Sequence, residues 1–130
     1  MSHIKKTFES FINEEFEQVS EIRRIKDIVR NVNAEIVKET PELLVLRIGD
    51  FAAAKKLGSP SWGIVHSERM WSYYVDKYTN QYFVYDFSKS PTDKEYLLGV
   101  TVKPGGKIEH AYYQDDTPAD LEYVDSLGLD

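Results

Sequence analysis

Apolar residues in the first third of the chain recur at steps of three and four positions, the spacing of one face of a helix. The stripe contains Ile4, Phe8, Phe11, Ile12, Phe16 and Val19, and it continues through Ile22, Ile25, Ile28, Val29 and Val32. We therefore expect an N-terminal helical arm over residues 1–33. Ser20 is a suitable N-cap, so the stripe fits two helices with a break near Val19–Ser20 as well as it fits one.

The length of this arm leaves two arrangements open. At about 1.5 Å per residue, thirty helical residues extend to about 45 Å, which exceeds what a domain of this size can cover. Part of the arm can therefore pack on a partner or on a second copy of the chain. In the alternative, both halves fold back on the rest of the protein.

From residue 34 the pattern changes to short β-prone runs separated by turns. The expected strands are Ala34–Lys38, Leu43–Ile48, Trp62–His66, Gln81–Phe87, Tyr96–Lys103 and Lys107–Tyr113. In the fourth of these, alternation places Phe83, Tyr85 and Phe87 on one face and Tyr82 and Val84 on the other. The last two runs flank Pro-Gly-Gly, which predicts a hairpin.

Three helices are expected between or after these strands, each with its own start signal. Asp50 caps a helix that ends before Gly58, and Ser67 caps a helix from Glu68 to Tyr78. Thr117, followed by proline and an acidic residue, is expected to cap a last helix that ends near residue 127.

Together these elements predict an α+β fold with a mainly antiparallel sheet of five or six strands and helices on one face. The arm of residues 1–33 precedes it, and residues 34–130 form the α+β domain. The 130 residues, 42% of them apolar, suffice for one domain and would make poor cores if divided.

Composition indicates the compartment in which the protein works and the kinds of partner that it can bind. The chain has no cysteine, no continuous apolar segment of about 18 residues and no secretory signal, so we expect a cytoplasmic protein without membrane contact. The net charge is −6, and no Lys or Arg follows Lys107. General nucleic-acid binding is therefore not expected. Asp115 and Asp116 belong to this acidic end. Such an end is typical of a solvated tail that keeps a small protein soluble, and the alternative is that it meets a basic protein surface.

No motif specifies a reaction. The glycines form neither a dinucleotide-binding pattern nor a P-loop, and no Gly-x-Ser-x-Gly elbow occurs. His110 with Asp115 and Asp116 could approach a cation, but adjacent aspartates before a helix are typical of loop and cap residues, so no metal and no cofactor are expected. His66 and an unidentified carboxylate are the sole candidates for a hydrolase-type enzyme.

Aromatic residues concentrate between positions 55 and 87, where both tryptophans lie. Trp62 and Trp71 are typical of core anchors. A second interpretation is a cleft at the start of the helix capped by Ser67, where His66, Arg69, Trp71 and Tyr74 hold a nucleotide-like ligand by stacking and charge. In that interpretation the helix N-terminus attracts the phosphate.

Several short segments, taken in their order along the chain, resemble the sequences of a known group of proteins. The series is Lys56-Leu57-Gly58-Ser59, Ser61-Trp62-Gly63-Ile64, Trp71 with Tyr74, Tyr82-Phe83-Val84 and Gly99-Val100-Thr101-Val102. It resembles small uncharacterised proteins of tailed bacteriophages that carry a Trp-Cys-Ile segment, a Trp-x-x-Tyr helix and an aromatic strand. Gly63 stands where that group has Cys. The resemblance covers residues 50–113 and implies a phage accessory protein or a minor virion component.

The sequence thus favours a non-catalytic accessory protein of phage type that binds a host or phage protein. The arm would supply the contact, through self-association or through a partner that meets Phe8, Phe11, Ile12 and Phe16. The alternatives are a small-ligand binder that uses the aromatic cleft and a small hydrolase-type enzyme.

Overall fold

The centre of the protein is a five-stranded antiparallel sheet in which the strands follow chain order, β1-β2-β3-β4-β5. The computed structural model describes residues 18–76 and 78–129. The strands are β1 (Ala34–Glu39), β2 (Leu43–Ile48), β3 (Asn80–Asp86), β4 (Leu97–Val102) and β5 (Ile108–Tyr113). The predicted runs in these five places are confirmed, and so is the hairpin between β4 and β5.

The helical elements are α2 (Phe51–Leu57), η1 (Gly63–Val65), α3 (Glu68–Tyr74), η2 (Lys94–Tyr96) and α4 (Leu121–Ser126). A helix over residues 18–30 precedes the sheet. Two predicted caps are confirmed. The Asp50 carboxylate accepts a hydrogen bond from the Ala53 amide, and the Ser67 hydroxyl accepts one from the Met70 amide. Each cap satisfies an amide that the first helical turn leaves unpaired.

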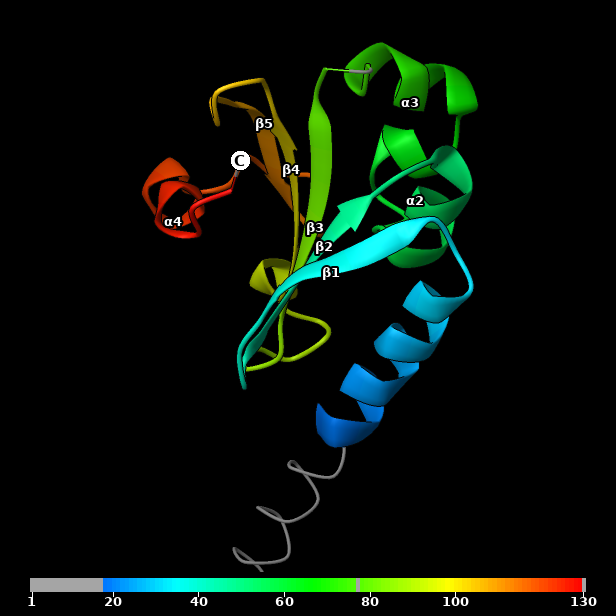
Figure 1. Ribbon diagram of the computed structural model, residues 1–130. Coiled ribbons are helices and arrows are strands. Elements are labelled where there is room, and N and C mark those ends of the chain that lie inside the picture. The colour runs from blue at the N-terminus through cyan, green and yellow to red at the C-terminus, as the bar shows by residue number, and fades with distance from the viewer. Residues whose placement is uncertain (1–17, 77, 130) are drawn as a thin grey trace, which may run out of the picture.

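Helices cover both faces of the sheet (Figure 1). Helix 18–30, α2, η1 and α3 lie on one face, which we call the first face. Its core includes Ile25, Val29, Leu57, Phe83 and Tyr85. On the second face, α4 packs on a core that is mostly aliphatic, with Val45, Val84, Leu98, Val100 and Val124 among its members. The expected α+β class with a mainly antiparallel sheet is confirmed, and α4 adds cover on the second face.

The structure corrects two predicted elements next to the tryptophans, one in its type and one in its end. Residues 62–66 are not a strand: η1 is a 3₁₀ turn, with the His66 amide donating to the Gly63 carbonyl. Trp62 and Val65 are both buried, and their three-residue spacing puts them on one side of a 3₁₀ turn but on opposite faces of a strand. Helix α3 ends at Tyr74 rather than Tyr78, because Asp76 accepts backbone hydrogen bonds from residues 78 and 79 and closes a loop.

Near the ends of the chain, the structure overturns one expectation and excludes one of the alternatives left open. Thr117 does not cap the last helix; Asp120 does, by accepting from the Glu122 amide. The reason is that residues 117–119 pair with the edge of β5, where the Ala119 amide donates to the Ala111 carbonyl at 3.0 Å. At the other end, Ser20 caps no helix, since residues 18–30 are continuously helical.

The described part of the arm folds back on the sheet. Ile25 and Val29 belong to the core of the first face, and the Tyr96 hydroxyl donates to the Glu21 carboxylate at 2.9 Å. None of the described helices combines the length and the apolar character that crossing a membrane requires.

Candidate functional site

A cavity of about 350 Å³ opens on the first face, above β3, β4 and β5 and below η1 and α3. We call it the aromatic cavity. Strand register aligns two rows of side chains under it: Gln81, Thr101 and His110 are neighbours across the three strands, and Phe83, Gly99 and Tyr112 form the next row. The complete lining is Trp62, Gly63, Ile64, Met70, Tyr74, Gln81, Gly99, Thr101, His110, Tyr112 and Asp116.

Gly99 makes room for one wall of this cavity. The Trp62 ring lies over it so closely that a Cβ at position 99 would lie 3.0 Å from the indole Cη2 atom. The indole is held from two further sides: its Nε1–H donates to the Tyr113 carbonyl at 2.9 Å, and its ring centroid is 5.2 Å from that of Phe83. Trp62 is therefore a fixed wall, because a buried indole N–H keeps its position when it has a partner.

The floor of the aromatic cavity carries two buried polar side chains. Gln81 is 3% exposed and Thr101 is 4% exposed. The Thr101 hydroxyl donates to Gln81 Oε1 at 2.6 Å, and the Gln81 amide donates to the Tyr82 carbonyl at 3.3 Å. A buried polar group without a partner is costly, so these bonds permit an amide and a hydroxyl at positions that otherwise favour apolar residues.

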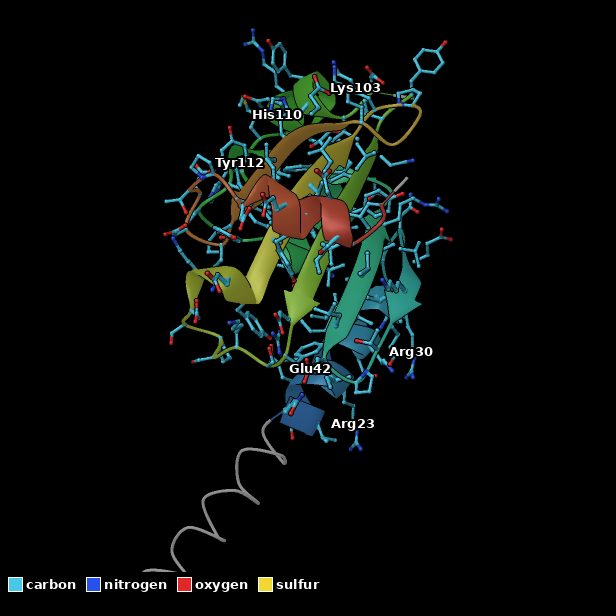
Figure 2. All side chains as sticks on the ribbon, turned by 90° about the vertical axis from the view of Figure 1, so that its left-hand side faces the viewer. Arg23, Arg30, Glu42, Lys103, His110 and Tyr112 are labelled. Atoms are coloured by element: carbon cyan, nitrogen blue, oxygen red, sulfur yellow. The ribbon has the colours of Figure 1, made fainter. Side chains whose placement is uncertain are left out.

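Three rings of α3 and β5 form the rim. The Tyr74 and His110 rings meet edge to face, with their centroids 5.1 Å apart, and His110 lies nearly parallel to Tyr112 at 6.4 Å. Figure 2 shows His110 and Tyr112 at the end of the sheet that lies away from Arg23 and Arg30 on helix 18–30. Tyr112 is 38% exposed, so the rim presents aromatic surface to an incoming molecule.

Charge is sparse around the aromatic cavity. Asp116 is the one carboxylate among the lining residues given above, and none of them is a lysine or an arginine. Within the described ranges, 18–76 and 78–129, no cluster of three or more His, Cys, Asp or Glu side chains could hold a metal ion. The chemistry of this lining is that of stacking and neutral hydrogen bonds.

The structure separates the four residues predicted to hold a ligand. Tyr74 lines the aromatic cavity. Trp71 is buried in the core and lines a different cavity, beside β1 and β2. Arg69 and His66 are exposed and line neither, and the His66 ring contacts the Pro60 carbonyl. The expected junction between stacking rings and a phosphate-binding arginine is therefore not assembled around the aromatic cavity.

The residues predicted to meet a protein partner fall into two groups. Phe8, Phe11, Ile12 and Phe16 lie outside the described residues. Asp115 and Asp116 lie in the exposed turn after β5. The Thr117 hydroxyl and amide donate to the Asp115 carboxylate, and the hydroxyl in particular holds the pKa of that carboxyl below its usual value. Asp116 reaches the edge of the aromatic cavity.

Sequence reasoning missed Gln81, Thr101 and Tyr112 as members of a site, although a signal for the first two is present. Alternation along β3 puts Gln81 on the same side as Phe83 and Tyr85, where a polar residue is unexpected. Thr101 alternates in the same way with Gly99. The sequence predicts that β4 and β5 pair as a hairpin, but it does not show which residues of β3, β4 and β5 lie opposite one another, since the rows depend on register.

Comparison with known proteins finds no matching family model, no matching curated protein and no matching solved structure. The resemblance to small proteins of tailed bacteriophages therefore stays a prediction. The phage group has Cys where this chain has Gly63. A side chain at that position would fit in the wall of the aromatic cavity, because a Cβ there would lie 3.5 Å from Met70, an ordinary contact distance.

Proposed function

We propose that the protein is a binding module for a small planar molecule, which it holds in the aromatic cavity without chemical change. The observation that carries this proposal is the buried pair Gln81–Thr101 on the cavity floor, which lies beside His110 and Tyr112 of β5 and below Tyr74 of α3. Ligand sites typically combine apolar and aromatic walls with a few polar groups that fix orientation. An amide and a hydroxyl at the bottom of an aromatic cavity meet that description.

The walls support a ligand of limited size. Small-molecule sites usually range from about 300 to about 1,000 Å³, and this cavity of about 350 Å³ is at the lower end. Trp62 is fixed by its hydrogen bond to the Tyr113 carbonyl, so the cavity is largely formed before a ligand enters. A preformed wall lowers the ordering cost of binding.

The experiment that tests this proposal is a titration of the full chain with a library of uncharged planar fragments, followed by amide NMR. We expect shifts that centre on Gly63, Gly99 and Thr101, and their loss in Tyr74→Ala. The matched control is Tyr78→Ala, since Tyr78 is 65% exposed and does not line the cavity. Fragments that bind only elsewhere, or that bind Tyr74→Ala as well as the wild type, would contradict the proposal.

A second candidate function is the accessory role of phage type, in which the protein binds a host or phage protein, or itself, in the cytoplasm. One observation favours it: Val19 on helix 18–30 is 53% exposed, and it lines a shallow groove with Ile22, Arg23, Lys26 and Arg30. Exposed apolar surface rimmed by charge is typical of protein contacts. Native mass spectrometry of the same full-length sample separates the two functions, because a defined oligomer or a bound host protein that Val19→Asp abolishes would favour the second.

A further inference from the structure

The hydrogen-bonding capacity of the cavity floor indicates the chemistry of the ligand, and this step rests on the proposed function. The Gln81 amide has two N–H groups, and one of them is used by the Tyr82 carbonyl. Thr101 uses its hydroxyl proton on Gln81 Oε1, which leaves the lone pairs of its Oγ1 atom able to accept. Among the described residues, the floor therefore offers one amide donor beside one hydroxyl acceptor.

Such a pair is complementary to a group that carries an acceptor and a donor side by side. In a planar heterocycle the lactam edge, where a ring N–H is adjacent to a carbonyl, is one such group. An amino-substituted edge, where a ring nitrogen is adjacent to an NH₂ group as in adenosine, is the other. The carbonyl would accept from the Gln81 amide, and the ring N–H would donate to Thr101 Oγ1. A ligand on the floor would exclude water from these two buried side chains, so a ligand edge that does not match their hydrogen bonds would be costly.

The charges around the aromatic cavity argue against a phosphorylated ligand. Phosphate sites rely on lysine, arginine or a cluster of backbone amides, and the lining contains neither cationic residue. Asp116 at its edge would repel an anion. Arg69, the arginine expected to hold a phosphate, is exposed and does not line the cavity.

We infer that the aromatic cavity binds an uncharged planar heterocycle through its lactam edge. The ligand class is a nucleobase or a nucleoside and not a nucleotide, which carries a phosphate. The ring would lie among Trp62, Tyr74 and Tyr112, with its lactam edge on Gln81 and Thr101. The sugar or other substituent would face the open side near Asp116.

Calorimetric titration of the full-length protein with matched probes tests this inference. Uridine and inosine carry a lactam edge; 3-methyluridine and 1-methylinosine carry the same rings with that N–H blocked. We expect at least one of the two parent nucleosides to bind, and its methylated form to bind about tenfold more weakly or worse, the effect of one lost buried hydrogen bond. The 5′-monophosphate of the same nucleoside should bind no more tightly than the nucleoside.

Variants at the floor provide the second arm of the test. Thr101→Val removes the acceptor at nearly constant shape and should weaken nucleoside binding about tenfold, whereas Thr101→Ser keeps the hydroxyl and should retain it. Should Thr101→Val unfold, the methylated probes on the wild type still decide the question.

The outcomes also separate this inference from the proposed function. Equal binding of parent and methylated nucleosides, or clearly tighter binding of the monophosphate, overturns the lactam assignment. If no nucleoside binds while uncharged fragments still occupy the aromatic cavity, the assignment fails and the binding function stands. If neither nucleosides nor fragments shift the cavity residues, both fail.

Discussion

The two faces of strands β3, β4 and β5 come from the same three segments of chain but are filled in different ways. On the second face, Leu98, Val100 and Val102 are almost completely buried, and Val124 of α4 closes over them. On the first face, the alternate positions of β4 are Gly99 and Thr101, and the aromatic cavity remains above them. Aliphatic side chains fill space, whereas a glycine and a hydroxyl leave it open.

The difference in packing between the two faces explains why the aromatic cavity lies on the first face. Both faces have a covering helix, and both belong to one sheet, so the cavity is due to the choice of residues at alternate positions. Gln81, Gly99 and Thr101 contribute less apolar packing than the aliphatic residues on the reverse side. Such positions weaken a core unless they serve recognition, which is why the proposed binding function is placed at this part of the first face.

The largest expected effect is on the second face. Leu98 is 1% exposed, so Leu98→Ala should lower the free energy of unfolding by about 3 kcal/mol, through lost burial and the space left behind. On the first face, Tyr112→Ala at the rim of the cavity removes a side chain that is 38% exposed and should cost about 1 kcal/mol. Urea denaturation of both variants measures the difference, and equal losses would show that the open rim contributes as much packing as the filled second face.

A smaller effect is expected at the glycine under the cavity wall. Gly99→Ala places a methyl group 3.0–3.2 Å from three atoms of the Trp62 ring. Because the Tyr113 carbonyl and Phe83 hold that ring, the variant should lose about 1.5 kcal/mol of stability. It should also shift tryptophan fluorescence.

The control for this variant is Gly63→Ala, in the part of the cavity lining that η1 contributes. Its new methyl group would meet Met70 at 3.5 Å, so its stability should stay within about 0.5 kcal/mol of the wild type. A Gly99→Ala protein as stable as Gly63→Ala would show that the Trp62 wall yields easily.

The smallest effect concerns the helix that covers the first face. A hydrogen bond from Arg24, with a further one from Tyr96, holds the pKa of Glu21 below its usual value, although burial opposes this. Because the pKa is lower in the folded state, the stabilisation is present above the pKa of the unfolded chain and is lost as the pH falls through the folded value. The side chains are partly exposed, so we expect less than about 1 kcal/mol.

Denaturation of the wild type and of Glu21→Gln at about pH 7 and about pH 3 checks this sign. The stability advantage of the wild type over the variant should shrink at the lower pH. An advantage that is unchanged or larger there would contradict the role of the Glu21 carboxylate in holding helix 18–30.

Some elements could be predicted because their signals are local. The caps at Asp50 and Ser67 act within three residues, and the two faces of β3 follow from alternation along one strand. Elements that depend on distant contacts were predicted less well. The start of α4 moved to Leu121 because residues 117–119 pair with β5, and no property of Thr117 itself could reveal that.

The residues of the candidate site were likewise predicted only in part. Tyr74 was expected in it from the aromatic pattern, and it lines the aromatic cavity. Trp71 and Arg69 were expected with it, since they lie on the same short helix. Their separation depends on which side of α3 faces the sheet: Trp71 is buried against the core and Arg69 is exposed.

The sequence by itself determined the α+β class and the two antiparallel pairs β1–β2 and β4–β5, since their strands are joined by short turns. It also determined which residues face each side of a strand. Only the tertiary structure decided that Gln81, Thr101 and His110 form one row and that Trp62 lies over Gly99. The physical reason is the separation along the chain of the residues that each kind of interaction joins. Alternation and capping act over a few residues. Strand register and the seating of η1 on the sheet join positions from 9 to 51 residues apart, through backbone hydrogen bonds and the Trp62 indole.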